Sequence, residues 1–396
     1  MQPLSGIKVL DLGRALAGPF CSLMLADMGA EVVKIEPPGL GDDSREWPPL
    51  QGGESCYFVS FNRNKRSIVI DLASPEGQTI FRSMVESADV VVENYRTGVM
   101  ERWGLGYEDL RAINPRLVYC AISGFGRTGP YAKKPATDIY MQAFSGLMSV
   151  TGEPGGPPIR IGVSICDLTA GLYSALGVMG ALQARERTGE GQFIDTSLLE
   201  TQMSYISYLF TSFLSTGKLP QPQGSGHLSI VPYQAFMTSD GWVSLATFND
   251  RLWRRACVAM QIEHLADDPR FLTNALRLEH RNELIPLLEV VFLTRTSAEW
   301  VEIMDEHDVP LAPVQSVDEV IAHPQVKHRE MIQTIEHPTA GTLGIFGFPL
   351  KFSETPCEYR LPPPTLGQHT RQILAEYGYG DDRVEELFKN GVVAGL

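Results

Sequence analysis

Residues 7–36 read IKVLDLGRALAGPFCSLMLADMGAEVVKIE, and their pattern decides the fold. Apolar residues predict a buried strand over 7–12, a helix over 19–28 and a second strand over 31–36. This order is typical of a βαβ unit, in which a helix joins two parallel strands. The first turn, GRALAGP, lacks the GxGxxG spacing of dinucleotide-binding folds, so support for an NAD site is weak.

The same pattern continues along the first half of the chain. A helix is expected from Ser74 through Val85, and strands are expected over 68–72, 90–92 and 117–122. Such alternation predicts an α/β fold class with a mostly parallel sheet that helices cover on its faces.

The composition changes near residue 217, where GKLPQPQGSGH is typical of a linker between domains. We therefore expect the first part of a large domain over 1–216 and a linker with a small α+β domain over 217–330. A return segment over 331–396 is expected to complete the large domain.

Charge and cysteine usage exclude several classes of function. With a net charge of −14 over 396 residues, the chain lacks the basic surface of a general nucleic-acid binder, so we expect no nucleic-acid partner. Six scattered cysteines without CxxC spacing are typical of reduced thiols in a cytoplasmic protein. The N-terminus lacks a signal-peptide pattern, and the longest uncharged run, residues 168–184, is shorter than the ~20 residues that span a bilayer. We expect no membrane partner.

Asp167 stands where a strand-like run gives way to an apolar helix. Ile161, Val163 and Ile165 alternate as in a strand, and apolar residues recur at helical spacing from Leu168 onward. We therefore expect Asp167 at or near the N-cap, where backbone N–H groups favour an ionised carboxylate. From its position alone, Asp167 is either a helix cap or a nucleophile.

Other charged and glycine-rich segments are candidates for a site. Arg63, Lys65 and Arg66 form a basic cluster, which is either a polyphosphate anchor or a solvated turn. Asp138 precedes an apolar stretch and is either a second active-site carboxylate or a helix cap. The turn GFGRTGP over 124–130 suits a loop that lies close to a ligand. The chain contains no GxSxG, HExxH or Walker motif, and we expect no metal site.

Several long motifs occur in order along the chain. They are PLSGIKVLDLGRALAGPFCSLMLADMGAEVVKIEPP at 3–38, NRNKRSIVIDL at 62–72, ADVVVENYRTGVMERWGLGYEDL at 88–110, the Asp167 segment through RTGEGQ, and HLSIVPYQAF with DGW at 227–242. With these motifs the sequence resembles the family III CoA-transferases, which include formyl-CoA transferase and carnitine CoA-transferase. The resemblance runs nearly from end to end.

The resemblance assigns roles to individual residues. It implies that Asp167 is the acyl-accepting aspartate. It also implies that Asn94 and Arg102 lie against the CoA nucleotide and that Ala15 and Ala17 line the same channel.

Further positions either match the family or depart from it. Asp138 occupies the place of an active-site glutamate in formyl-CoA transferase, so it is a candidate second acid. Lys65 and Arg66 of the basic cluster complete the predicted contacts to CoA. Leu16 and Pro38 replace a glutamine and an arginine of that enzyme, which leaves formate or oxalate specificity open.

The later motifs, HLSIVPYQAF, HPTAGTLG and LPPPTLGQHT, are most similar to the branch that uses succinyl-CoA and other dicarboxyl substrates. A second substrate carboxylate requires a cation, and Arg45, Arg63 and His227 are candidates. The related 2-methylacyl-CoA racemases place a histidine where this chain has Thr137, which cannot exchange a proton near neutral pH. A transferase is therefore favoured, and the alternatives are a racemase, a catalytically idle CoA-binding protein and an NAD-linked oxidoreductase.

The resemblance also implies a reaction and an assembly. CoA passes from an acyl-CoA to a free carboxylic acid through an aspartyl anhydride and an aspartyl-CoA thioester. N–H groups of the turn from Gly124 to Gly129 are expected to stabilise the oxyanions, and no metal or redox cofactor takes part. The implied fold is a Rossmann-like large α/β domain with an inserted small α+β domain, in an interlocked homodimer.

Overall fold

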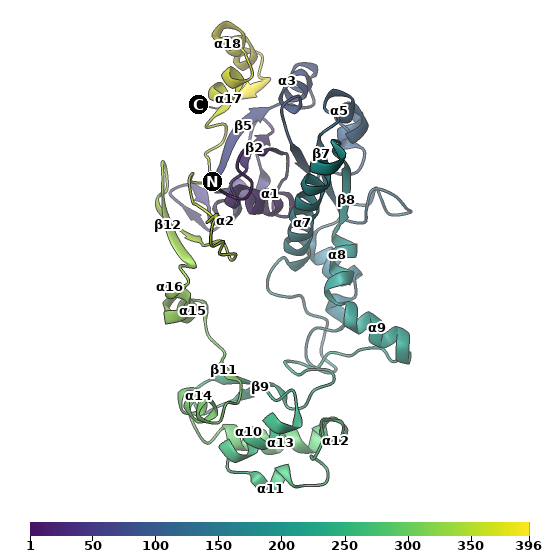
Figure 1. The fold of residues 1–396 in the computed structure, drawn as a ribbon, viewed down its shortest axis with the longest axis vertical. Helices are drawn as coiled ribbons and strands as arrows, with labels where there is room; N and C mark the ends of the chain where they lie inside the picture. The colour runs from purple at the N-terminus through teal and green to yellow at the C-terminus, as the bar shows by residue number, and fades with distance from the viewer. Residues whose placement is uncertain (396) are drawn as a thin grey trace. The chain divides into compact units, whose positions relative to one another are not determined.

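A computed structural model describes residues 1–395, which divide into two compact units (Figure 1). The first unit comprises residues 1–147, 161–210 and the chain from 325 onward, so it is drawn from both ends of the sequence. The second unit comprises residues 148–160 and 211–324. The division falls a few residues before each predicted limit, and it assigns 148–160 to the second unit.

A seven-stranded sheet forms the centre of the first unit, with the strand order β14-β5-β2-β1-β6-β7-β8. Six of its strands are parallel, and only the short edge strand β14 is antiparallel. Numbered along the chain, the parallel strands lie in the order 3-2-1-4-5-6, which is the order of the Rossmann fold. The predicted α/β class is confirmed. The strands are β1 (Lys8–Asp11), β2 (Glu31–Glu36), β5 (Lys65–Ile70), β6 (Val90–Glu93), β7 (Val118–Ser123), β8 (Phe193–Ser197) and β14 (Val393–Ala394).

Apolar side chains fill both faces of this sheet because successive residues of a strand point to opposite sides. Val91 of β6 belongs to a core under one set of helices, whereas its neighbours Val90 and Val92 belong to the core on the other face. The first set contains α3 (Pro75–Val85), α5 (Tyr107–Ile113), α17 (Thr370–Glu376) and α18 (Asp381–Lys389). The second set contains α1 (Ala17–Asp27), α6 (Asp138–Phe144), α7 (Ile165–Thr188) and α8 (Leu198–Tyr205).

Helix α7 corrects the prediction for the segment around Asp167. Residues 161–164 do not form the predicted strand, and the helix begins at Ile165 with Ser164 as its N-cap. Asp167 is therefore the third residue of the helix, near the N-cap as expected, although Ser164 is the cap itself. By length and composition alone α7 is apolar enough to cross a membrane, but half of its most apolar window is buried within the protein. Burial of this kind is typical of a core helix.

The second unit contains a three-stranded antiparallel sheet of β9 (Tyr233–Met237), β10 (Trp242–Ala246) and β11 (Leu311–Pro313). The pairing of β9 with β10 is the hairpin that the Asp240–Gly241 turn predicts. Its core is built on large buried side chains such as Trp253, Phe292 and Trp300. Its helices include α10 (Asp250–Ala259), α11 (Glu263–Ala266), α12 (Asn274–Glu279), α13 (Arg281–Phe292), α14 (Ser297–Glu306) and α15 (Val317–Ala322).

Shorter elements complete the chain. They are η1 (Asp43–Glu46), β3 (Leu50–Gln51), β4 (Glu54–Ser55), α2 (Cys56–Asn62), α4 (Val99–Arg102), η2 (Leu147–Ser149), α9 (Ser207–Thr216), α16 (Pro324–His328), β12 (Ile332–His337) and β13 (Gly341–Phe346).

Candidate active site

A pocket of about 210 Å³ lies at the carboxyl ends of β6 and β7 in the first unit. In a sheet with this order, the connections leave β1 and β6 in opposite directions, which opens a ligand crevice at the carboxyl edge. The pocket wall includes residues 94–97 after β6, residues 122–124 at the end of β7, Ala17 at the start of α1, and Asp167 of α7. The topology therefore brings Asp167 to the edge of the sheet where ligands bind.

Asp167 carries a carboxylate that is partly buried and chemically unsatisfied. No side-chain or backbone group within residues 1–395 donates a hydrogen bond to it. Burial raises the pKa of Asp167 to about 7, and the negative charge of Asp138 adds to this shift. A pocket carboxylate with a raised pKa and no hydrogen-bond donor is a candidate functional group.

Asp138 and Gln142 of α6 hold the segment that leads into α7. The buried carboxylate of Asp138 accepts from the Cys166 N–H at 2.8 Å and from Gln142 Nε2 at 2.6 Å. Gln142 Nε2 also donates to the Val163 carbonyl at 3.2 Å, and its Oε1 accepts from the Ile161 N–H at 2.9 Å. Asp138 is thus a cap, although it caps the neighbouring helix α7 and not the helix that it begins. A direct role for Asp138 in the reaction stays a prediction.

A glycine allows α7 to approach the start of α1. A Cβ added at Gly171 would lie 2.7 Å from the Ala17 carbonyl oxygen, which is closer than real contacts allow. Asp167 and Gly171 are four residues apart and so lie on one face of the helix. The close approach at Gly171 therefore places the carboxylate and Ala17 in the same pocket.

The residues predicted to contact CoA have different surroundings. Ala17 and Asn94 line the pocket. The Asn94 amide is bound to backbone, because its Oδ1 accepts from the Arg14 N–H at 2.8 Å and its Nδ2 donates to the Arg14 carbonyl at 2.9 Å. Ala15 adopts a left-handed conformation with φ 61° in the same loop. Arg102 is exposed, and no carboxylate of residues 1–395 pairs with it.

The structure contradicts the expectation that Arg63 and Lys65 anchor a polyphosphate. Both side chains are buried, Arg63 against Asp27 at 2.5 Å and Lys65 against Asp11 at 3.0 Å. Arg66 pairs with Glu376 at 2.6 Å and lines a different pocket, with the first residues of β1 and β2. That pocket is at the amino edge of the sheet, away from Asp167.

Arg45 and Arg63 are likewise poor candidates for a second substrate carboxylate. Arg45 forms two hydrogen bonds of 2.7 Å with Glu36 and stacks 3.7 Å above the centre of the Phe58 ring. A sequence signal exists for the Asp27 pair, because Asp27 ends an otherwise apolar helix and a buried carboxylate requires a buried cation. His227 belongs to the second unit, where its Nδ1 accepts from the Ser229 N–H at 3.1 Å, and its predicted role stays untested.

Two cations of the pocket were missed by reasoning from the sequence. Arg96 and Lys134 line the pocket with exposed side chains, and neither pairs with a carboxylate in the described part of the chain. Lys134 Nζ instead lies 3.7 Å above the Tyr131 ring. Their positions in the sequence could have revealed them, because Arg96 follows the carboxyl end of β6 and Lys134 precedes α6, whose Asp138 caps α7.

Tyr57 of α2 was also missed. Burial raises the pKa of its phenol, and the negative charge of Asp167 adds to this shift. Reasoning from the sequence could not single out Tyr57, because it is an aromatic residue within an apolar helix.

The glycine turn after β7 is partly pinned, and its expected role as a source of N–H donors to the oxyanions stays a prediction. The Gly126 N–H donates to Ser123 Oγ at 3.0 Å, and the Arg127 N–H donates to Asp195 at 2.9 Å. The Arg127 guanidinium also binds Glu93 at 2.9 Å, and burial raises the pKa of that glutamate to about 7. Two amides of the turn are therefore engaged before any ligand arrives.

Comparison with known proteins agrees with this geometry. The family model described as CoA-transferase family III matches residues 4–370. The chain belongs to CoA-transferase family III. The resemblance read from the sequence motifs is thereby confirmed. Within residues 1–395 no three histidine, cysteine, aspartate or glutamate side chains gather in a way that could hold a metal ion.

Relatives of this family III chain match it along nearly its whole length. The human succinyl-CoA:glutarate CoA-transferase is 41% identical, over 99% of this chain and 90% of the relative. A succinate–glutarate CoA-transferase of Agrobacterium fabrum is 41% identical, over 94% of this chain and 95% of the relative. The crystal structure of a CAIB/BAIF family protein from Brucella suis superimposes with a TM-score of 0.85 at 38% identity, covering 95% of this chain and 99% of that one.

Proposed function

We propose that the protein transfers CoA from succinyl-CoA or another dicarboxyl-CoA to a free carboxylic acid, with Asp167 as the nucleophile. The observation that carries the proposal is the Asp167 carboxylate, which faces the pocket without a hydrogen-bond donor and has a pKa of about 7. The names of the human and Agrobacterium fabrum relatives support the dicarboxyl substrate class.

The reaction proceeds through two covalent states of Asp167. The carboxylate attacks the thioester carbonyl of the donor and releases CoA thiolate, which leaves a mixed anhydride. The thiolate then attacks the aspartyl carbonyl, which frees the donor acid and forms an aspartyl-CoA thioester. The acceptor carboxylate displaces CoA from this thioester, and the thiolate attacks the acceptor acyl carbonyl of the new anhydride to regenerate Asp167. Each step conserves the energy of the thioester.

Cations of the pocket serve the phosphates of CoA in this proposal. Arg96 and Lys134 line the pocket, and Arg102 is exposed at the end of α4, so all three are free to meet an anion. They replace Lys65 and Arg66 as the predicted phosphate contacts. His227 remains the candidate for the second substrate carboxylate.

We further propose an interlocked homodimer, with the second unit as an inserted small domain, in the cytoplasm. Apolar side chains that the first unit leaves exposed support the dimer, because patches of this kind mark interfaces. They include Ile139 and Phe144 of α6, Leu172 and Leu176 of α7, and Tyr205 of α8. Light scattering coupled to gel filtration is expected to give twice the chain mass, and a monomer would contradict this part of the proposal.

A mass-spectrometric experiment tests the activity and its nucleophile. Succinyl-CoA is offered to a panel of free carboxylic acids, and new acyl-CoAs are expected with the wild type. Asp167→Asn is expected to lower the rate by at least about a thousandfold, because the covalent route is lost. With succinyl-CoA alone, a CoA adduct is expected on the peptide that contains Asp167.

The control is Asp43→Asn, which changes an exposed carboxylate that pairs with Arg14. It is expected to retain the exchange and the adduct. Absence of exchange with every acid would contradict the proposal, and deuterium uptake at C2 of a 2-methylacyl-CoA would then point to the racemase.

A further inference from the structure

The loop between β1 and α1 does not stabilise its own conformation. Ala15 has φ 61°, a left-handed conformation that is unfavourable for residues other than glycine. Leu16, the N-cap of α1, makes no side-chain capping bond. The conformation of residues 13–16 must therefore be imposed by other parts of the chain.

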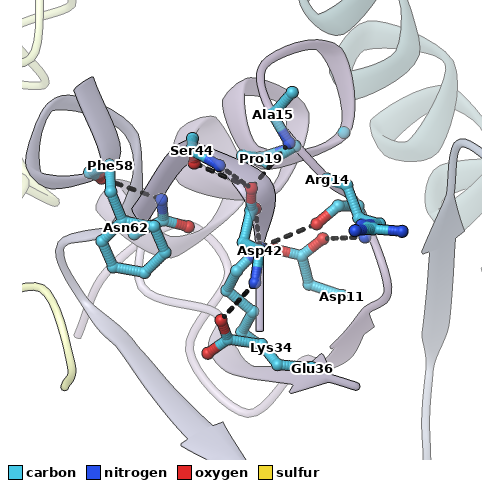
Figure 2. Close-up of polar contacts among 12 residues, drawn as sticks. Asp11, Arg14, Ala15, Pro19, Lys34, Glu36, Asp42, Ser44, Phe58 and Asn62 are labelled. Carbon is cyan, nitrogen blue, oxygen red and sulfur yellow. Dashed lines mark hydrogen bonds and ion pairs between the residues drawn. The ribbon is translucent and has the colours of Figure 1, made fainter. Parts of the chain in front are cut away.

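Buried polar groups supply this constraint (Figure 2). Asp42 Oδ1 accepts from the Ala15 N–H at 3.0 Å, and Lys34 Nζ donates to the Gly13 carbonyl at 2.7 Å. Asp42 and Lys34 also pair with each other at 2.8 Å, and their side chains are 0% and 1% exposed. Ser44 donates two further hydrogen bonds to Asp42 Oδ1, from its N–H at 3.0 Å and from its hydroxyl at 2.8 Å.

The pair stays ionised because the network compensates its burial. Burial alone would raise the pKa of Asp42, but Lys34 and the hydrogen bonds to its carboxylate hold it far below its usual range. Burial opposes the charge of Lys34, but Asp42, Asp11 and Glu36 raise its pKa. A buried pair of this kind is poor evidence for stability and fits a role in selecting one conformation.

The loop is coupled to the nucleophile through direct backbone packing. A Cβ added at Gly13 would lie 2.7 Å from the Gly18 Cα, so the loop and the start of α1 touch without side chains between them. Ala17 in turn meets Gly171 of α7, one turn after Asp167 on the same helix face. A shift of the loop therefore moves the pocket wall and the helix that carries the nucleophile.

We propose that Asp42 and Lys34 are positioning residues, which impose the left-handed turn at Ala15 and thereby set the acyl-CoA pocket for transfer. Their effect on kinetics rests on the proposed transferase activity. Their effect on the loop does not.

The test removes both charges together, so that no unpaired charge stays buried. In the double variant Lys34→Met/Asp42→Ala, amide hydrogen exchange of the peptide over residues 13–17 is expected to accelerate. The kcat/KM for succinyl-CoA is expected to fall by about 10- to 100-fold, because misplacement of this size is costly to an active site. Glu46→Ala is the matched control from the same short helix η1, because this exposed carboxylate forms no hydrogen bond or ion pair with residues 13–17, and it is expected to leave both quantities within about twofold of wild type.

A rescue separates positioning from general destabilisation. Glycine adopts the left-handed conformation without strain, so adding Ala15→Gly to the double variant is expected to recover part of the lost kcat/KM. Absence of recovery would overturn the claim that Asp42 and Lys34 act through Ala15. Unchanged exchange over residues 13–17 in the double variant would overturn the proposal as a whole.

A milder variant covers the case in which the double variant does not fold. Ser44→Ala removes one tether of Asp42 and is expected to accelerate exchange over residues 13–17 to a smaller extent, while unchanged exchange would overturn the proposal. If the wild type shows no transfer, the proposed function fails, and the exchange experiment still decides whether Asp42 and Lys34 hold the loop.

Discussion

Asp42 and Asp167 are both carboxylates near the carboxyl edge of one sheet, and their environments are opposite. Asp42 accepts hydrogen bonds from Lys34, Ala15 and Ser44, and its pKa is held far below the usual range. Asp167 accepts none within residues 1–395, and burial raises its pKa to about 7. The difference teaches that hydrogen bonds and a paired cation keep a buried aspartate ionised, whereas burial without them raises its pKa.

Breaking the satisfied network is expected to have the largest effect on stability. Lys34→Met leaves Asp42 buried and unpaired, and we expect the free energy of unfolding to fall by about 3–5 kcal/mol. Urea unfolding followed by circular dichroism measures this. The control is Lys133→Met, which removes an exposed lysine and is expected to change stability by less than about 0.5 kcal/mol. Equal stability of the two variants would contradict the structural role of Lys34.

Replacing the Asp167 carboxylate, which accepts no hydrogen bond within residues 1–395, is expected to raise the free energy of unfolding and not to lower it. Because folding raises the pKa of Asp167 from 3.8 to about 7, the folded state retains a proton that the unfolded state loses as pH rises through this window. Wild-type stability therefore falls between pH 4 and 7 on account of this group. Asp167→Asn removes the effect, so the variant is expected to match wild type below pH 4 and to exceed it by roughly 2–4 kcal/mol above pH 7. Thermal unfolding across this range is the measurement, and a pH-independent difference would contradict the raised pKa.

Two glycine substitutions in α7 test the packing of this helix against the start of α1, which connects Asp167 to the loop that Asp42 holds. Gly171→Ala places a methyl group against the Ala17 carbonyl, and we expect a loss of about 1–3 kcal/mol together with lower activity. Gly180→Ala meets no atom within 4 Å and is expected to stabilise the helix by up to about 1 kcal/mol. Melting temperatures of the two variants decide this, and a stabilising Gly171→Ala would contradict the close approach.

The smallest expected effect sharpens the role of Asp138. With Asp167 as the nucleophile, kcat/KM is expected to rise with pH and to level off above about pH 7. Asp138→Asn removes the charge that adds to the shift, so the rising limb is expected to move to lower pH by up to about one unit. Asp138→Glu keeps the charge and is expected to keep the limb near pH 7. If Asp138→Asn does not move the rising limb of the pH profile, burial alone sets the pKa of Asp167.

Prediction from the sequence succeeded where the signal is local. Strands of β1, β2, β6 and β7 were found because apolar runs between turns depend only on neighbouring residues. The start of α7 was placed wrongly, because Asp138 of another helix caps it and Ile161, Val163 and Ile165 alternate without forming a strand. A helix end that is capped by a side chain far away in the sequence leaves no pattern among its neighbouring residues.

The sequence by itself determined the α/β class and the family, because periodicity and long ordered motifs are properties of the chain alone. Only the tertiary structure decided which cations are free to bind. Arg63 and Lys65 meet Asp27 and Asp11, which lie 36 and 54 positions away in sequence, while Arg96 and Lys134 face the pocket without a carboxylate partner in the described chain. Pairing and burial depend on contacts that form when the sheet and its helices assemble, so residue type alone cannot separate a buried counter-ion from a ligand-binding cation.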